Sequence, residues 1–372
     1  MGPRDTGGGH QGRVGDALIR SLACALVLAG FSGGAAGEDP DWAYPVSPAA
    51  RDEAALKRVP GSTRAYTQAQ IDDGFNPPDW FPLEHPPMPE IVAQGRPPEI
   101  RACAFCHLPS GDGRPETARL AGSPVAYLMR QIAQHRSGAR KGVRSAIMTG
   151  IAQAVSDADA RAASEYFASL KPRVRVRVVE TRTVPKSAVG AGGIRFAVPG
   201  GETEPIKDRI IELPEDEERV RSRDPHAGFV AYVPVGSIEK GKALVTTGRA
   251  GTTLPCDSCH GPSLHGLEDV PGIAGRSPIY VFRQLRDMKT GNRSGPAMDL
   301  MKVVVARLDP DEMIAVAAYI GSLDPQPPQP APIPPGPGEP AAGKSSPVIQ
   351  APPIPPIPDS APAEKIELSP SR

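Results

Sequence analysis

The sequence predicts an all-α fold built from two tandem copies of one small domain. The pattern C-x-x-C-H occurs twice in the 372 residues, at 103–107 and at 256–260. Adding 153 to a residue number in the first copy gives its counterpart in the second, without a gap, from this pattern to the end of the last predicted helix. Apolar residues recur at helical spacing within each copy. An internal repeat of this kind indicates two units of the same fold.

The paired residues extend well beyond the C-x-x-C-H pattern. The pairs are Pro109 and Pro262, Gly122 and Gly275, Tyr127 and Tyr280, Arg130 and Arg283, Gln131 and Gln284, Gly138 and Gly291, Met148 and Met301, Tyr166 and Tyr319, and Pro172 and Pro325. Because the copies correspond so closely, whatever one binds the other is expected to bind as well.

The repeated pattern is typical of covalent haem attachment. Two thiols three positions apart can each form a thioether with one vinyl group of haem, and the histidine directly after the second thiol can bind the iron. The thiols are Cys103, Cys106, Cys256 and Cys259, and the histidines are His107 and His260. Four thiolates in one zinc site, or a redox dithiol, are the alternatives. The adjoining histidine in both copies favours haem, so two covalently bound haem c groups are predicted.

The predicted helices correspond between the copies. A short helix from Pro89 to Gly95 corresponds to a longer one that ends near Gly248, with Ser237 as its expected N-cap. The later pairs are 124–135 with 278–288, and 156–170 with 309–323, the last two capped by Ser156 and Asp309. The methionines at 148 and 301 fall before these final helices, in stretches expected to be loops.

Composition divides the rest of the chain. Residues 1–37 look like a secretory signal peptide, because three arginines precede an apolar run at 22–31 and small residues stand at 35–37. An uncleaved anchor is the alternative, although the run is short for a membrane span. Cys24 lies within this run, so the exported chain would keep only the four cysteines of the two haem motifs.

The domain organisation follows from these boundaries. We expect a signal peptide (1–37), an irregular N-terminal arm (38–87), a first haem domain (88–172), an inter-domain linker (173–236), a second haem domain (237–325) and a proline-rich disordered tail (326–372). In the linker Val174, Val176 and Val178 alternate with arginines, which predicts a few short strands that pack on both haem domains. A flexible tether is the alternative.

The whole series of features resembles the class I c-type cytochromes. It runs from C-x-x-C-H through Leu-Ala-Gly or Ile-Ala-Gly, then a Tyr and a Gln on the next helix, then a methionine, to a capped helix that carries a tyrosine. Two copies in one exported chain resemble the dihaem cytochromes c of bacterial periplasms. The resemblance covers about 89–172 and 237–325, and it implies two tandem cytochrome c-like domains.

The resemblance also implies the sixth iron ligands. Met148 and Met301 each stand forty-one residues after the haem histidine, where the family has its axial thioether. A thioether opposite imidazole stabilises ferrous iron and raises the reduction potential, which suits an electron carrier. The alternative is that these methionines only fill the core. Met298 is a rival in the second copy, although its counterpart is Ser145.

Two departures from the family pattern concern the first copy. The family places a proline before the Ala-Gly pair, and the carbonyl of this proline accepts a hydrogen bond from the haem histidine. Pro271 stands there in the second copy and Ala118 in the first, so we expect a less rigid first site with the same ligand. Met88 stands where the second copy has Gly241, so the first helix pair should pack differently.

Charge gives little further guidance. The formal net charge is zero, which offers no case for binding nucleic acid. Cations gather near each methionine, and this basic face is expected to steer an acidic redox partner, unless it is only a solvated surface. They are His135, Arg136, Arg140, Lys141 and Arg144 in the first copy, and Arg286, Lys289, Arg293 and Lys302 in the second.

The sequence therefore predicts a periplasmic carrier of single electrons rather than an enzyme. By resemblance, it would link a quinol-oxidising complex or a dehydrogenase to a terminal oxidase or another cytochrome, with no membrane span after signal cleavage. One alternative is a dihaem peroxidase or sulfur-compound oxidoreductase, for which His135 and His265 are the available histidines. Another is a cytochrome subunit of a dehydrogenase complex.

Overall fold

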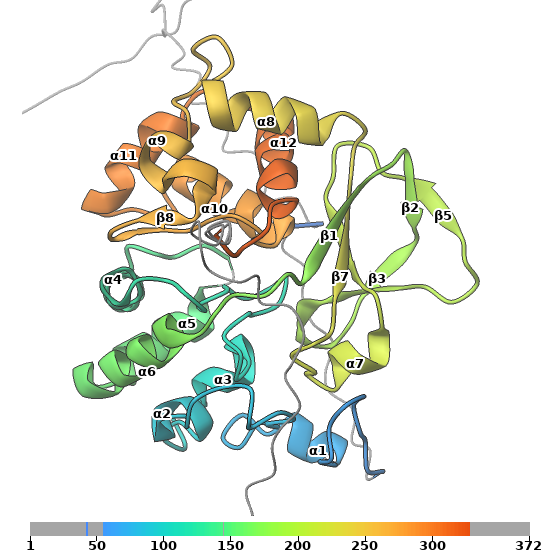
Figure 1. Cartoon of the computed structure of the whole chain (residues 1–372), viewed down its shortest axis with the longest axis vertical. Helices are drawn as coiled ribbons and strands as arrows, with labels where there is room; N and C mark the ends of the chain where they lie inside the picture. The colour runs from blue at the N-terminus through green and yellow to red at the C-terminus, as the bar shows by residue number, and fades with distance from the viewer. Residues whose placement is uncertain (1–41, 44–54, 144, 328–372) are drawn as a thin grey trace, which may run out of the picture. The chain divides into compact units, whose positions relative to one another are not determined.

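The computed structural model describes residues 42–43, 55–143 and 145–327 (Figure 1). The predicted signal peptide, Arg144 and nearly all of the predicted tail lie outside these described residues. The described chain is mostly helical, with small sheets that lie mainly between the two haem motifs, and it belongs to one compact unit.

The first copy contains five helices. They are α2 (Glu90–Ala93), α3 (Cys103–His107), α4 (Val125–Arg136), α5 (Ala146–Ala154) and α6 (Asp157–Ser169). Their apolar faces meet in a core that includes Ile91, Leu128 and Phe167. The predicted N-cap is confirmed, because the Ser156 hydroxyl accepts a hydrogen bond from the Asp159 amide at 3.1 Å.

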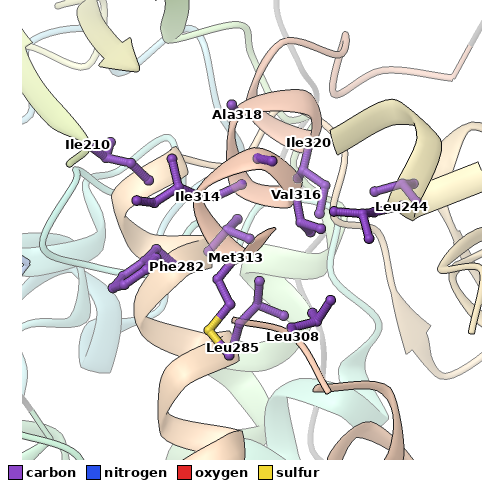
Figure 2. Close-up of a cluster of buried hydrophobic side chains, with 14 of the residues drawn as sticks. Ile210, Leu244, Phe282, Leu285, Leu308, Met313, Ile314, Val316, Ala318 and Ile320 are labelled. Atoms are coloured by element: carbon purple, nitrogen blue, oxygen red, sulfur yellow. The ribbon is translucent and has the colours of Figure 1, made fainter. Parts of the chain in front are cut away.

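The second copy has the corresponding helices. They are α8 (Ser237–Thr247), α9 (Asp257–His260), α10 (Pro278–Thr290), α11 (Pro296–Val305) and α12 (Pro310–Gly321). Figure 2 shows their core, where Leu244 of α8 and Phe282 of α10 surround side chains of α12 such as Val316. Asp309 forms the predicted cap of α12, as a capping box with Glu312.

Two expectations about local structure are wrong. Met148 and Met301 lie on helices, α5 and α11, rather than in loops. Ser237 is the first residue of α8 rather than its N-cap, a position held by Gly236 in the left-handed region at φ 87°. The free amide of Ile238 is satisfied instead by the Glu180 carboxylate at 2.7 Å.

The packing of α8 against α12 depends on Gly241. A Cβ atom added there would lie 2.0 Å from the Ala315 carbonyl oxygen and 2.8 Å from the Tyr319 Cβ. The two helices can therefore approach this closely only because position 241 has no side chain. In the first copy α2 is a single turn, and Met88 packs against the core beside it. This difference agrees with the departure seen in the sequence.

Strands occupy much of the segment between the copies. The strands β1 (Val176–Glu180), β7 (Phe229–Val233) and β6 (Ile211–Pro214) form a sheet in the order β1-β7-β6, in which β1 is parallel and β6 antiparallel to β7. Antiparallel pairs are formed there by β2 (Thr183–Pro185) with β5 (Thr203–Pro205) and by β3 (Ser187–Val189) with β4 (Arg195–Ala197). A further antiparallel pair, β8 (Gly266–Leu267) with β9 (Val270–Pro271), lies within the second copy after its motif. Short helices complete the set: α1 (Gln68–Ile71), η1 (Ala191–Gly193), α7 (Glu217–Arg221) and η2 (Pro262–Leu264).

The segment between the copies contacts both of them. Arg175 donates a hydrogen bond to the Gly113 carbonyl of the first copy at 2.8 Å. On the other side, the carboxylate of Glu212 in this segment accepts hydrogen bonds from two groups of the second copy, the Ser277 hydroxyl at 2.8 Å and the Ile279 amide. Glu212 is almost fully enclosed, and its second carboxylate oxygen has no partner among the described residues.

The first prediction concerns Gly241. Gly241→Ala forces a methyl group against the Ala315 carbonyl, so the free energy of unfolding should fall by about 1–3 kcal/mol. The control is Gly150→Ala in α5, where a Cβ meets nothing within 4 Å and stability should stay the same or rise by about 0.5–1 kcal/mol. Equal stability of the two variants in urea unfolding would contradict the tight crossing.

The second prediction concerns the pH dependence of stability. Burial raises the pKa of Glu212 from 4.5 to about 7, against the opposing hydrogen bonds from Ser277 and Ile279. The folded protein therefore keeps this proton between pH 4.5 and 7 while the unfolded chain has lost it, so the stabilisation is present below pH 4.5 and lost as the pH rises through 7.

Glu212→Gln should remove this loss of folding stability between low and high pH, which is on the order of 3 kcal/mol. The measurement is urea unfolding of the holoprotein at pH 5 and pH 8. The exposed carboxylate of Glu99 provides the control, and Glu99→Gln should keep the wild-type difference between the two pH values. A Glu212→Gln protein with the wild-type difference would show that this carboxyl group titrates normally.

Candidate haem-binding sites

The two motif histidines are held in the same way. His107 ends α3, and its Nδ1 lies 2.8 Å from the carbonyl oxygen of Ala118. His260 ends α9, and its Nδ1 lies 2.8 Å from the carbonyl oxygen of Pro271. A carbonyl only accepts, so Nδ1 carries the proton and Nε2 keeps the lone pair that can bind a metal. The predicted acceptor role of Ala118 is thus confirmed, at the same length as in the copy with proline.

Both imidazoles are neutral in this environment. Burial lowers the pKa of His107 and of His260, and the hydrogen bond to the carbonyl only partly opposes it. The loop that supplies the Ala118 carbonyl is itself fixed, because the Thr117 hydroxyl donates to the Cys106 carbonyl at 2.9 Å. Each histidine is therefore both oriented and unprotonated at Nε2, as an iron ligand must be.

A cavity of about 1100 Å³ joins the predicted site residues of the first copy. Cys103, Cys106, His107 and Met148 all line it. Its remaining walls include apolar side chains of α4, α5 and α6, such as Leu128, Ile151 and Phe167. Two thiols, an imidazole and a thioether around one large, mainly apolar space match the donor set and surroundings that haem c needs. The residues of the first copy therefore fit this cofactor.

The four thiols do not gather in one place. Cys103 packs against the core of the first copy and Cys256 against the core of the second. Burial raises the pKa of each of these two thiols to about 12, so they are protonated rather than thiolate. A four-thiolate zinc site needs all four sulfurs around one ion, and a redox dithiol needs a low thiol pKa. The geometry thus favours thioether attachment over both alternatives.

In the second copy two methionines lie near the motif. Both Met298 and Met301 belong to α11. Met298 is buried within the core cluster of this copy, whereas Met301 is partly buried and packs against the same cluster, as does Cys256. Only Met301 matches Met148 in the repeat.

The surroundings of the two motifs differ. In the first copy the Arg223 guanidinium lies 3.8 Å from the centre of the Phe105 ring and donates to the Phe105 carbonyl at 2.8 Å. The same side chain donates to the Ile71 carbonyl, which ties the N-terminal segment over this motif. In the second copy Cys259 is exposed. Segments outside the repeat thus cover the first motif, an asymmetry that the sequence pattern did not reveal.

An exchange of arginines joins the two copies. Arg140 of the first copy donates to Tyr280 at 3.2 Å and to Gln284 at 2.7 Å in the second. Its counterpart Arg293 donates to Tyr127 at 3.3 Å and to Gln131 at 2.9 Å in the first. Each arginine also bonds the glutamine of its own copy. The contact therefore repeats the internal symmetry of the sequence.

The backbone around Arg140 also pairs with the backbone around Arg293. Arg140 and Arg293 face each other in an antiparallel bridge, in which the Lys141 amide donates to the Asn292 carbonyl at 2.7 Å and the Ser294 amide to the Ala139 carbonyl at 2.8 Å. Eight charge-assisted and backbone bonds around one symmetric point hold the copies in a defined arrangement.

The basic face expected from the sequence is therefore wrong in its main members. Arg293 and His135 are buried, and Arg140 is used in the contact between the copies. The guanidinium of Arg136 donates hydrogen bonds to the carbonyls of Ala152 and Val155 and to the carboxylate of Asp157. His135, Arg140 and Arg293 therefore lie within the fold, whereas Arg136 is exposed and bonds to its own copy.

The chain is similar in sequence to several known cytochromes. No protein-family model matches it. It is 28% identical over 229 residues to a thiosulfate dehydrogenase electron acceptor of Thiomonas intermedia (61% of this chain, 80% of that protein) and 25% identical over 252 residues to cytochrome c4 of Azotobacter vinelandii (65% and 92%). Cytochrome c-554(548) of Halomonas halodenitrificans is 38% identical over 72 residues, which cover 87% of that protein and 19% of this chain. Among solved structures, thiosulfate dehydrogenase TsdBA from Marichromatium purpuratum aligns with a TM-score of 0.44 at 30% identity, covering 63% of this chain and 39% of that one.

Sequence relatives and site geometry agree on a c-type cytochrome, a protein that binds haem c covalently and transfers electrons. The chain belongs to the class I c-type cytochromes, as predicted from its sequence.

The third prediction tests the arginine exchange. Arg140→Met and Arg293→Met remove donors that share the same two glutamines, so their effects on the free energy of unfolding should deviate from additivity by about 0.5–3 kcal/mol in a double-mutant cycle. Arg130→Met is the control, because it breaks an exposed ion pair with Asp269 across the same contact and should cost under about 1 kcal/mol. Additive effects of Arg140→Met and Arg293→Met would contradict a shared network.

Proposed function

We propose that the protein is a two-haem electron carrier, with one haem c in each of two domains at 88–172 and 237–325. The observation that carries the proposal is the repeated geometry of the motif histidine. In both copies Nδ1 is held by a carbonyl at 2.8 Å, which leaves Nε2 for iron. The internal repeat then assigns the same cofactor to both copies.

The proposed roles follow the repeat. The thiols of Cys103, Cys106, Cys256 and Cys259 would form the thioethers. His107 and Met148 would hold the iron of the first haem, and His260 and Met301 that of the second. The cavity shared by His107 and Met148 supports this arrangement in the first domain. Iron with six ligands has no open position for a substrate, so the role that fits is electron transfer rather than catalysis.

Export and partners belong to the same proposal. The signal-like residues 1–37 support secretion to the periplasm. Among residues 42–43, 55–143 and 145–327, no helix is long and apolar enough to cross a membrane. A quinol-oxidising complex or a dehydrogenase would donate the electrons, and a terminal oxidase or another cytochrome would accept them.

A more specific candidate is the acceptor partner of a dehydrogenase. Two relatives are named thiosulfate dehydrogenase electron acceptors, and they match 61% and 62% of this chain. The test is to mix the oxidised holoprotein with a thiosulfate dehydrogenase and thiosulfate, and to follow the haem absorption. Reduction that depends on both the enzyme and thiosulfate supports this donor. Reduction no faster than in a buffer control would show that thiosulfate dehydrogenase does not donate electrons to this protein.

The fourth prediction tests the axial methionines. Met148→Ala and Met301→Ala should each remove about half of the far-red sulfur-to-iron band of the ferric holoprotein and lower the reduction potential of one haem, because the thioether favours ferrous iron. Optical redox titration measures both effects.

Met129→Ala is the matched control, because this partly buried methionine packs in the core of the first copy outside the proposed ligand set. It should keep the full band. A band that survives Met301→Ala and disappears in Met298→Ala would transfer the ligand role in the second domain to Met298.

A further inference from the structure

His135 lies on the face of α4 that lines the cavity of the first copy. Tyr127, Leu128, Gln131 and His135 all line this cavity and recur one helical turn apart. The ring of His135 is 6% exposed. Its side chain therefore belongs to the wall around the proposed first haem rather than to the surface.

The ring has no hydrogen-bond partner within the part of the chain that the structure describes. Nδ1 is buried without one, and none of the hydrogen bonds among the described residues involves either ring nitrogen of His135. Leaving a buried polar group unsatisfied costs about 1–3 kcal/mol. Burial, followed by the positive charges of Arg140 and Arg293, lowers the pKa of His135 to about 3. The imidazole is thus neutral at pH 7, with a lone pair that nothing in the described chain uses.

His135 and Met148 line the same cavity. The helix α5, which carries Met148, follows α4 and packs against it, and both side chains line the cavity that contains His107. In the second copy the counterpart of His135 is Met288, which is buried in the core cluster together with Met298. The corresponding positions therefore offer an imidazole in the first copy and a thioether in the second.

We propose that His135 is a reserve axial ligand of the first haem iron and replaces Met148 when that thioether is lost. The proposal rests on the proposed function, in which His107 and Met148 hold this iron. The exchange breaks one sulfur–iron bond and forms one nitrogen–iron bond. It needs neither an electron nor a proton, because the ring is already neutral. Imidazole is a good ligand for iron and a harder one than thioether, so the exchange favours the ferric state.

The test compares the two copies within one chain. We would record low-temperature EPR and far-red absorption of the ferric holoproteins Met148→Ala and Met301→Ala. In Met148→Ala the first haem should stay low-spin with a bis-imidazole signal and without its share of the sulfur band. In Met301→Ala no bis-imidazole signal should appear, because Met288 stands in the second copy where the first has His135.

Adding His135→Phe to Met148→Ala should then convert the first haem to high-spin. If that double variant fails to retain haem, free imidazole supplies the second measurement. Occupation of the site by His135 should make imidazole bind at least tenfold more weakly to Met148→Ala than to Met148→Ala/His135→Gln.

Three results are distinguishable. A high-spin first haem in Met148→Ala, with unchanged imidazole affinity on removal of His135, would overturn the reserve-ligand role. A full sulfur band in Met148→Ala would instead overturn the proposed ligation by Met148. A bis-imidazole signal lost on changing His135 would establish the inference.

Discussion

One hydrogen bond, from the haem-motif histidine to a backbone carbonyl, occurs in both copies, and the proposed binding of iron depends on it. An imidazole has two nitrogens, and it presents one of them reliably only when the other is held. The carbonyls of Ala118 and Pro271 accept this hydrogen bond at the same distance, 2.8 Å. The loops after each motif, the turn that bonds Thr117 to the Cys106 carbonyl and the hairpin of β8 and β9 can all be understood as supports for this contact.

The second organising feature is the exchange of Arg140 and Arg293 between the copies. Burial and the charge of Arg140 lower the pKa of Arg293, yet the guanidiniums are kept in place by glutamine and tyrosine oxygens. These contacts hold the two copies of the repeat in one defined arrangement. The surroundings are nevertheless unequal, because Arg223 and the N-terminal segment cover the first motif while Cys259 is exposed. Equal ligands in unequal surroundings are expected to give two different reduction potentials.

Much of the site could be predicted from the sequence, because its chemistry is local. Two thiols and a histidine within five residues predict the proposed attachment, and a repeat without gaps extends the prediction to both copies. Helices α4, α6, α10 and α12 were predictable from apolar periodicity and from caps such as Ser156 and Asp309. The acceptor role of Ala118 was predictable as well, since it depends on the backbone and not on the side chain.

Other features depend on contacts between distant residues, and local patterns did not reveal them. The amide of Ile238 is satisfied by Glu180, far away in the chain, so Ser237 was wrongly expected to cap α8. Arg140 and Arg293 are predicted from the sequence to lie on a basic surface, whereas their partners in the other copy show that they lie between the copies. Helices α5 and α11 are short, and neither begins with a side-chain cap, so the methionine segments were expected to be loops.

The most direct test of the central claim is the haem content of the purified holoprotein. Intact mass under denaturing conditions, combined with the pyridine haemochrome spectrum, counts the haems that stay covalently attached. The account predicts the mass of the chain plus two haems, with a spectrum typical of two thioether bonds for each haem. A mass with one haem or none, or haem that is removed by acid and organic solvent, would contradict the assignment of both motifs.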